Sequence, residues 1–232
     1  MFETDSGPFR HELKYICSEA QLAMVRNRIL HLMTSDRHAG PDGVYTIRSL
    51  YFDDYDNRCF YENESGVDNR EKYRIRIYNH NSERIRLECK RKLRTKTQKQ
   101  SCALTEEQCR MLMKGIPLAP DPAYPPVLQK LLILMRTRYM QPKIITEYDR
   151  TPFVYPDGNV RVTFDRNIAS SNAIDCFLDE SIPRRPILLT GQHVLEVKYD
   201  AFLPTFLYHN LQISGLRQTA FSKYYLCRRY TL

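Results

Sequence analysis

Charged side chains that could bind phosphate recur at every second position in several short segments. In KYRIRIYN, Lys72, Arg74 and Arg76 alternate with apolar residues, and LECKRK (87–92) and LEVKYD (195–200) repeat the pattern with a glutamate among the cations. Arginine binds phosphate through two parallel hydrogen bonds, lysine supplies a point charge, and glutamate offers hard oxygen ligands for Mg²⁺ or Mn²⁺. These residue types suit phosphoryl transfer, which needs positioning, charge neutralisation and a divalent cation rather than a covalent intermediate.

The motifs of several other chemistries do not occur in the sequence. There is no GxxxxGK[ST] or GxGxxG loop and the chain has only eight glycines, so phosphate would have to be held by side chains. There is no GxSxG or HExxH motif, and the six histidines and seven cysteines do not cluster. Nucleophilic catalysis and a zinc site are therefore unsupported.

The composition favours a polyanionic partner. The 232 residues include 35 Lys and Arg against 27 Asp and Glu, a formal net charge of +8. A chain this basic is expected to bind nucleic acid, an anionic membrane surface or phosphate chains. Charge alone does not choose among the three.

Three features bear on location. The seven cysteines contain no CxxC pair, and we interpret them as the reduced thiols of a cytoplasmic protein. The N-terminus, MFETDSGPFRHE, is polar and acidic, so no signal peptide is expected. The longest aliphatic run, 131–135, is far shorter than the roughly 20 residues of a membrane-spanning helix. Any membrane association is therefore expected to be peripheral or through a partner.

Helix signals are few. Ser18 with Gln21, and Thr105 with Gln108, have the spacing of a capping box at the start of a helix. The first is followed by an apolar stripe that predicts a helix from Ser18 to Met33, and the second helix should end at Gly115. Further helices are predicted from Pro126, over 203–213 and from Ser222.

Seven segments alternate apolar and polar residues with the period of two that a strand shows. They are RHELKYI, TIRSLYFD, KYRIRIYN, RIRLECKRK, KIITEYDR, NVRVTFDR and VLEVKYD. Polar, turn-rich stretches such as 62–71 separate consecutive strands, which favours one antiparallel sheet system over alternating βαβ units. With the length of the chain, this predicts a single domain over residues 1–232.

Several of these segments carry most of their charges on one face, because residues two apart in a strand point the same way. Such a face is the solvated side of the sheet in many antiparallel proteins. Here, however, Arg and Lys recur in strand after strand at the alternate positions that share one face, which we call their parity. Few uncharged polar residues lie among them. The alternative is an α+β protein in which about eight strands close into a barrel, with the charges inside and the helices packed outside. Such an interior needs bound anions and a few carboxylates to offset repulsion.

Carboxylates on the charged faces are candidate metal ligands. Glu196, Glu88 and Glu12 could bind Mn²⁺ or Mg²⁺ through oxygen. Each also has a lysine two residues further on, with which it could form an ion pair. Both interpretations stay open for Glu12 and Glu88.

Eight short motifs occur in the order seen in the VTC domain, the polyphosphate polymerase domain of the vacuolar transporter chaperone complex and its bacterial relatives. They are RHELKY, IRSLYFDD, YRIRIY, LECKRK, EYDR, RVTFDRNI, LEVKYD and FSKYYL, and the resemblance extends from Phe9 to Arg228. The chain therefore resembles this branch of the CYTH, or triphosphate tunnel metalloenzyme, superfamily. HELKY keeps one glutamate and the lysine of the superfamily's ExExK pattern, which favours the VTC branch over the simple triphosphatases.

The resemblance implies an antiparallel eight-stranded β-barrel, a triphosphate tunnel, whose charged interior threads a triphosphate. It implies catalytic roles for Arg74, Arg76, Lys90 and Lys198. It implies that the triphosphate or the product chain is bound by Lys14, Lys99, Arg150, Arg161 and Lys223. Glu196 is similar to the metal-binding glutamate of the family.

The resemblance predicts a metal-dependent polyphosphate polymerase that transfers the γ-phosphoryl group of ATP to a growing chain. Hydrolysis of tripolyphosphate or a nucleoside triphosphate in the same tunnel is an alternative, because the sequence does not define the acceptor. A non-catalytic module that binds polyphosphate or inositol phosphates is another. Specific nucleic-acid binding is less favoured, because base stacking needs aromatic rings beside the cations and Tyr15, Tyr73 and Tyr199 lie on the opposite face.

Overall fold

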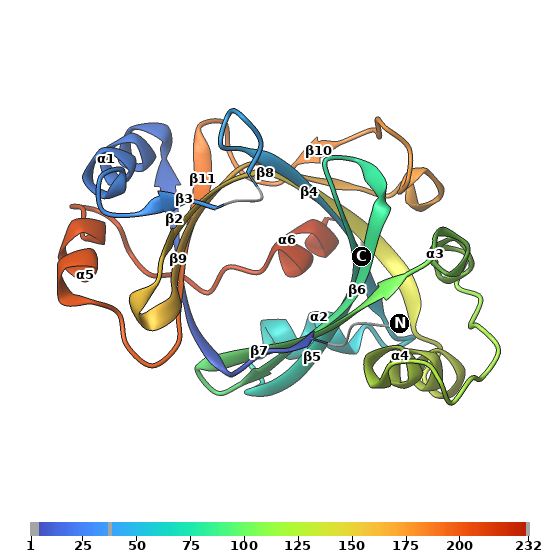
Figure 1. Ribbon diagram of the computed structural model, residues 1–232. Helices are drawn as coiled ribbons and strands as arrows, with labels where there is room; N and C mark the ends of the chain where they lie inside the picture. Colours follow the sequence, from blue (N-terminus) through green and yellow to red (C-terminus); the bar gives the residue numbers. More distant parts are fainter. Residues whose placement is uncertain (1–4, 37–38, 231–232) are drawn as a thin grey trace.

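The strands form one antiparallel sheet that closes into a ring, seen end-on in Figure 1. The computed structural model describes residues 5–36 and 39–230. The long strands of the ring are β2 (Arg10–Ser18), β4 (Tyr45–Asp53), β5 (Asn69–Tyr78), β6 (Asn81–Leu93), β7 (Lys96–Leu104), β8 (Gln141–Tyr155), β9 (Val160–Ser171) and β11 (Gln192–Tyr199). Their order is β2–β7–β6–β5–β4–β8–β9–β11, and β11 pairs with β2 again. The predicted α+β fold with an eight-stranded antiparallel barrel is therefore confirmed.

All seven alternating segments form strands of the ring, and β7 is the strand that the alternation does not predict. Its sequence, KTQKQSCAL, is polar on both faces over its first half. It pairs with β6 along its whole length and buries Cys102 and Leu104 in the core. Backbone pairing and these two apolar residues therefore make it a strand without a clear sequence pattern.

The ring is joined least extensively between β2 and β7. Only Arg10 with Thr97, and His11 with Lys96, pair across this junction, which we call the seam. On its other edge β2 pairs with β11 along the whole of that strand. Three two-residue strands extend the sheet: β1 (Asp5–Ser6) on β7, β3 (Thr34–Ser35) on β8 and β10 (Arg185–Pro186) on β9.

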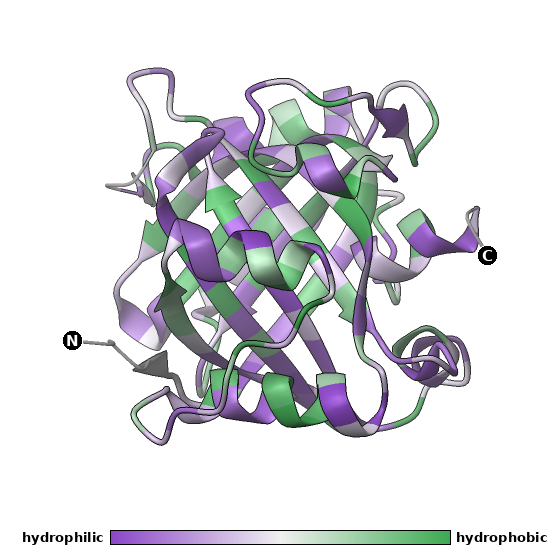
Figure 2. Ribbon diagram, turned by 90° about the vertical axis from the view of Figure 1, so that its right-hand side faces the viewer, coloured by the Kyte–Doolittle hydropathy of each residue, from purple (hydrophilic) through white to green (hydrophobic). Residues whose placement is uncertain are grey.

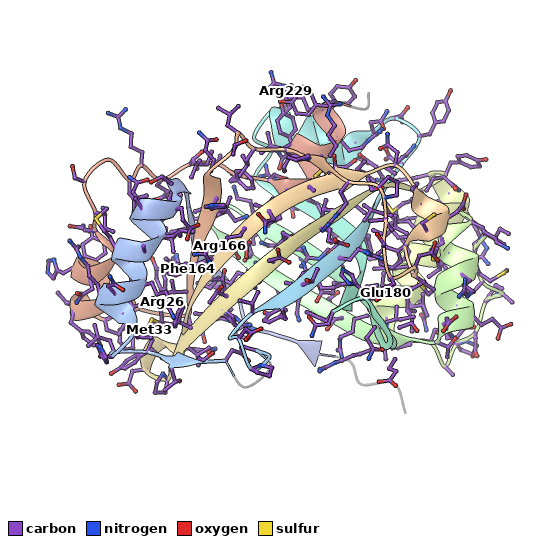
Figure 3. All side chains as sticks on the ribbon, turned by 90° about the horizontal axis from the view of Figure 1, so that it is seen from above. Arg26, Met33, Phe164, Arg166, Glu180 and Arg229 are labelled. Carbon is purple, nitrogen blue, oxygen red and sulfur yellow. The ribbon has the colours of Figure 1, made fainter. Side chains whose placement is uncertain are left out.

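Two pairs of helices cover the outside of the barrel on opposite sides (Figure 1). One pair is α1 (Glu19–Ile29) and α5 (Thr205–Leu211); the other is α3 (Glu106–Met113) and α4 (Pro126–Thr137). Figure 2 shows green apolar bands alternating with purple polar bands across the strands, and the outward apolar residues pack under these helices. In Figure 3, α1 runs along the outer side of β9, near Phe164. In the described parts of the chain, every helix is too short or too polar to cross a bilayer.

Both predicted capping boxes are present. Ser18 and Gln21 bond reciprocally at the start of α1, and Thr105 and Gln108 do so at the start of α3. The first helix is shorter than predicted, because its regular turns end at Ile29. These caps satisfy the first free N–H groups and so fix where each helix begins.

The remaining two helices, α2 (Arg58–Glu64) and α6 (Lys223–Arg229), lie together at one end of the barrel, at the top of Figure 3. In Figure 1, α6 appears within the outline of the ring, so this helix does not pack outside as expected. Its Tyr224 hydroxyl donates to Asp53, and Asp53 also accepts the backbone N–H of Cys59 at 2.8 Å. One buried carboxylate therefore ties α6 to the start of α2, a helix that the sequence did not predict.

A buried ion pair holds a long loop against the outside of the barrel. Arg48, with a relative exposure of 1%, donates to Glu147 on the neighbouring strand. It also donates to the backbone carbonyl of Phe177 at 3.0 Å and to that of Glu180 at 3.2 Å (Glu180 is labelled in Figure 3). Arg184 reaches the same glutamate at 2.7 Å. The loop is thus fixed by charge-assisted hydrogen bonds rather than by regular structure.

Candidate phosphate-binding tunnel

The barrel encloses a cavity of about 1100 Å³, which we call the tunnel. It is lined by inward-facing side chains of the strands and by the first turn of α6. Most of the predicted site residues line it, namely Glu12, Lys14, Arg74, Arg76, Lys90, Arg150, Glu196, Lys198 and Lys223. The charged faces therefore converge on one cavity and are not simply the solvated side of a sheet.

Glu12 and Glu196 form an acidic centre among lysines of the tunnel. They lie on adjacent strands, where Glu12 pairs with Lys198 and Glu196 with Lys14. The Lys198 ammonium lies 2.5 Å from Glu196 Oε1, and the Lys14 ammonium lies 3.6 Å from Glu12 Oε1. Lys90, on β6, also donates to Glu12. The diagonal arrangement of opposite charges lets the lysines approach each other without a large repulsion.

Burial and neighbouring charges set the ionisation of this centre. Burial would raise the pKa of Glu196, but Lys198 and Lys14 outweigh it and hold that pKa well below its ordinary value. The pKa of Glu12 is lowered in the same way. Burial lowers the pKa of Lys90 to about 8. Both glutamates are therefore negatively charged at neutral pH.

Glu88 holds two arginines of the tunnel wall in place. It is 1% exposed, and its Oε2 lies 2.7 Å from Arg74 Nη2 and 3.6 Å from Arg76 Nη1. Lys99 approaches its other oxygen to 3.6 Å. Neither Glu88 nor Lys99 lines the tunnel. Glu88 thus pairs with these three cations and not with Lys90, the lysine two residues further on, which contacts Glu12 instead.

Asp165 joins Arg150 to Lys223. Arg150 donates Nε and Nη2 to the two carboxylate oxygens at 2.7 and 2.8 Å, and the Lys223 ammonium lies 2.5 Å from Oδ2. Burial is offset by Arg150 and Lys223, which together hold the pKa of Asp165 below its ordinary value. The sequence analysis did not assign Asp165 a role. The sequence feature that could have identified Asp165 is its position in RVTFDRN, where it lies on the same strand face as Arg161.

Arg161 is the remaining predicted residue outside the tunnel lining. It lies 2.8 Å from Asp36 and donates to the Tyr45 hydroxyl at 3.0 Å. The tunnel also has cations that the sequence analysis did not include as site residues, which are Arg70, Lys72, Lys92 and Arg94. Three of these have the parity of predicted neighbours on the same strands, Arg70 and Lys72 with Arg74, and Lys92 with Lys90.

Tyrosines lie on both sides of the wall. Tyr15, Tyr73 and Tyr199 pack in the outer apolar clusters, as expected. Tyr51, Tyr148 and Tyr224 line the tunnel and were not predicted. Arg74 donates to the Tyr51 hydroxyl at 2.9 Å, and the Lys223 ammonium lies 4.4 Å from the centre of the Tyr148 ring. These tyrosines interact with cations of the protein itself.

The acidic centre suits a divalent cation that takes few ligands from the protein. Within residues 5–36 and 39–230, no three His, Cys, Asp or Glu side chains group as a metal site. Magnesium is commonly held by one or two carboxylates together with substrate phosphates and water. Thr163 lies opposite Glu196 on β9, and its buried hydroxyl has no hydrogen-bond partner in the described structure. Glu12, Glu196 and Thr163 thus offer an all-oxygen set that fits Mg²⁺ or Mn²⁺.

Comparisons with known proteins agree with this architecture. The sequence profile of the VTC domain matches residues 9–231. A solved structure from Hippeastrum, described as an adenylyl cyclase with a dominant triphosphatase activity, superposes with a TM-score of 0.51 at 10% identity and covers 97% of this chain and 96% of that one. A protein from Pyrococcus horikoshii gives a TM-score of 0.48 at 11% identity, covering 95% and 99% of the two chains. No curated protein sequence gave a significant match. At such low identity, the Hippeastrum structure supports the fold alone.

Proposed function

Because the chain belongs to the VTC domain family, we propose that it is a metal-dependent polyphosphate polymerase that uses ATP as phosphoryl donor. The observation that carries this proposal is the tunnel inside the barrel, whose walls combine cations from several strands with two adjacent carboxylates. A basic cavity inside a barrel favours a narrow, highly charged ligand, and a triphosphate or polyphosphate chain has that shape and charge. We further propose that residues 1–232 act as one tunnel domain.

The residues of the chain would bind and orient the donor and the acceptor. Arg74 and Arg76, held by Glu88, would bind the phosphates from β5, and Arg150 and Lys223, held by Asp165, would contact them from β8 and α6. The terminal oxygen of the acceptor chain attacks the γ-phosphorus of ATP, the bond to the bridging oxygen breaks, and ADP leaves with the electron pair. The surrounding cations stabilise the charge spread over the transferring group.

Glu12 and Glu196 would hold the divalent cation, Mn²⁺ or Mg²⁺. When bound, this ion neutralises charge on the phosphate oxygens. The carboxylates must then exchange part of their contact with Lys198 and Lys90 for the ion. Those lysines would in turn be free to contact the phosphates.

The proposed partners are ATP and polyphosphate. Nucleic acid is not proposed, because Tyr51 and Tyr148 in the tunnel contact arginine and lysine side chains of the protein itself. A cytoplasmic location is in keeping with seven cysteines that form no disulfide. Any membrane association is proposed to be peripheral.

The test is incubation of the purified protein with γ-labelled ATP and Mn²⁺ or Mg²⁺, followed by separation of the labelled products on a gel. A ladder of phosphate chains together with ADP supports the polymerase. Release of free phosphate without a ladder supports the alternative, a hydrolase of the same tunnel, which is the activity named for the Hippeastrum structure. Intact ATP together with metal-independent binding supports a module that only binds polyphosphate or inositol phosphates.

A further inference from the structure

Lys72 differs from the other lysines that line the tunnel near the acidic centre. Its Nζ donates to Asn63 Oδ1 at 2.6 Å and to Ser222 Oγ at 2.9 Å. In the described structure no carboxylate lies within ion-pair distance of it, whereas Lys14, Lys90, Lys198 and Lys223 each contact one, as set out above. Lys72 is therefore held by neutral oxygens alone.

The surroundings of Lys72 disfavour a positive charge on it. Arg70 on its own strand, Lys90 on β6 and Lys14 on β2 are the nearest cations, and each repels a further charge. From α2 it faces the Cys59 thiol and Asn63, and from the end segment Ser222 and the ring of Tyr224, 5.8 Å away. Burial and these cations lower the pKa of Lys72 to about 7.

The hydrogen bonds of Lys72 match those of a neutral amine. A neutral amine has two N–H groups and one lone pair. Its two acceptors, Asn63 and Ser222, take both N–H groups and leave the lone pair unused. Lys72 pairs across the sheet with Lys90, which in turn contacts Glu12. The lone pair is thus available next to a lysine that contacts the acidic centre.

We propose that Lys72 binds the end of the acceptor phosphate chain and accepts the proton that this end gives up, so that the attacking oxygen enters the reaction fully ionised. The inference rests on the proposed phosphoryl transfer and adds a residue and a substrate group to it. A terminal phosphate has a pKa near 6, so a part of the chain ends still carries a proton close to neutral pH. Internal phosphates have no such proton, so Lys72 distinguishes a chain end from the interior of a chain.

The step balances in atoms and charge. The P–O–H bond of the terminal phosphate breaks, its electron pair stays on the oxygen, and the proton moves to Lys72 Nζ. The new ammonium forms an ion pair with the doubly charged chain end. After transfer the elongated chain moves away, and the ammonium returns its proton to solvent. No further reactant is needed.

The binding part is tested without turnover by calorimetric titration of the protein with inorganic tripolyphosphate at pH 8, in two buffers with different ionisation enthalpies. Lys72 should start uncharged and gain a proton when the anion raises its pKa, so uptake of up to about one proton per ligand is expected. Lys90, whose pKa is about 8, should add part of a proton to the total, so Lys72→Arg and Lys72→Met should remove the larger share that belongs to Lys72 and leave the share of Lys90. No uptake by the unchanged protein, or equal uptake by Lys72→Arg, overturns the proposal.

The catalytic part is tested by the pH dependence of kcat/KM for the acceptor chain. Lys72→Arg keeps a cation but cannot accept the proton, so its kcat/KM should fall below that of the unchanged protein as the pH drops from 7 toward 6, where about half of the chain ends carry a proton, and should equal it at pH 9, where chain ends have lost their proton to solvent. Lys72→Met lacks the cation as well and should be impaired at every pH. If the pH dependence of kcat/KM for Lys72→Arg matches that of the unchanged protein, the proposal is overturned. Lys72 then has only a structural role, joining α2 to the start of α6 through its two hydrogen bonds.

The control is Lys130, which lies on the outer surface and pairs with Glu71 at 2.7 Å. Lys130→Arg and Lys130→Met change the same residue type away from the tunnel and should leave proton uptake and the pH profile unchanged. Thermal unfolding of all four variants shows that they are folded. If the protein makes no polyphosphate, the proposed function fails. The proton uptake on binding tripolyphosphate still shows whether Lys72 is uncharged in the free protein and becomes charged when the anion binds.

Discussion

The Lys223 ammonium lies 2.5 Å from Asp165 Oδ2, and this contact joins the last helix of the chain to the wall of the barrel. The same carboxylate accepts two hydrogen bonds from Arg150. One fully buried acid therefore positions two cations of the tunnel that come from different elements.

Asp165→Asn should lower the free energy of unfolding by about 3 kcal/mol at pH 7, because it leaves two buried cations without a counter-charge. Asp165 has a depressed pKa in the folded protein, so its contribution is complete above the unfolded value of about 3.9 and is lost as the pH falls through the folded value. Denaturant unfolding from pH 7 to 3 measures this, with Asp157→Asn as a surface control. A difference that stays constant below about pH 4 contradicts the assignment.

Glu196→Gln should reduce metal-dependent turnover by about 100-fold or more, because a neutral amide is a poor ligand for Mg²⁺ or Mn²⁺. Its shape is preserved, so the protein should fold and still bind tripolyphosphate. The measurement is the labelled-ATP assay together with binding by calorimetry. Turnover that stays near that of the unchanged protein removes Glu196 from the metal site.

Glu12→Gln and Glu88→Gln should separate a metal ligand from a positioning residue. Glu12→Gln should raise the Mn²⁺ concentration needed for half-maximal activity about 10-fold or more, because one of two carboxylates is lost. Glu88→Gln loosens Arg74 and Arg76, so it should raise KM for ATP and leave the metal requirement unchanged. A metal titration at saturating ATP compares the two. If both variants raise the Mn²⁺ concentration for half-maximal activity equally, Glu88 is a metal ligand as well.

Arg48→Met should lower the free energy of unfolding by about 3–5 kcal/mol, because it leaves Glu147 buried without its main partner. Replacing both residues, Arg48→Met with Glu147→Leu, should recover a large part of that loss, since the only charge left without its partner is that of Arg184, whose side chain is 51% exposed. Urea unfolding of the single and double variants gives the values. A double variant less stable than either single one is the result that this account does not allow.

The strand pattern predicted most of the fold and much of the site, because one property, the parity of charged residues, determines which side chains face the tunnel. That rule placed Lys14, Arg74, Lys198 and Glu196 in its lining, whereas Arg150 was expected there only from the family resemblance. It missed β7, since a strand with polar residues on both faces has no parity to detect.

Parity does not reveal how far along the barrel a residue lies or what its side chain contacts. Arg161 and Lys99 face inward by parity, but their positions along the strands take them to Asp36 and Glu88 instead of the cavity. Asp165 and Lys72 share the parity of predicted residues, but their roles depend on α6, which comes from far along the chain. The sequence also gave no sign that α6 lies within the ring.

The pairing of β2 with β11 joins the two ends of the sequence, with Glu12 opposite Lys198. During synthesis, the cations of β5 and β6 emerge on an open hairpin long before their counterparts exist. Glu196 and Lys198 arrive late, and Lys223 later still. A ribosome-bound chain therefore exposes a positively charged hairpin before the tunnel has formed. The complete charged lining of the tunnel therefore forms only when β11 docks and α6 enters the ring.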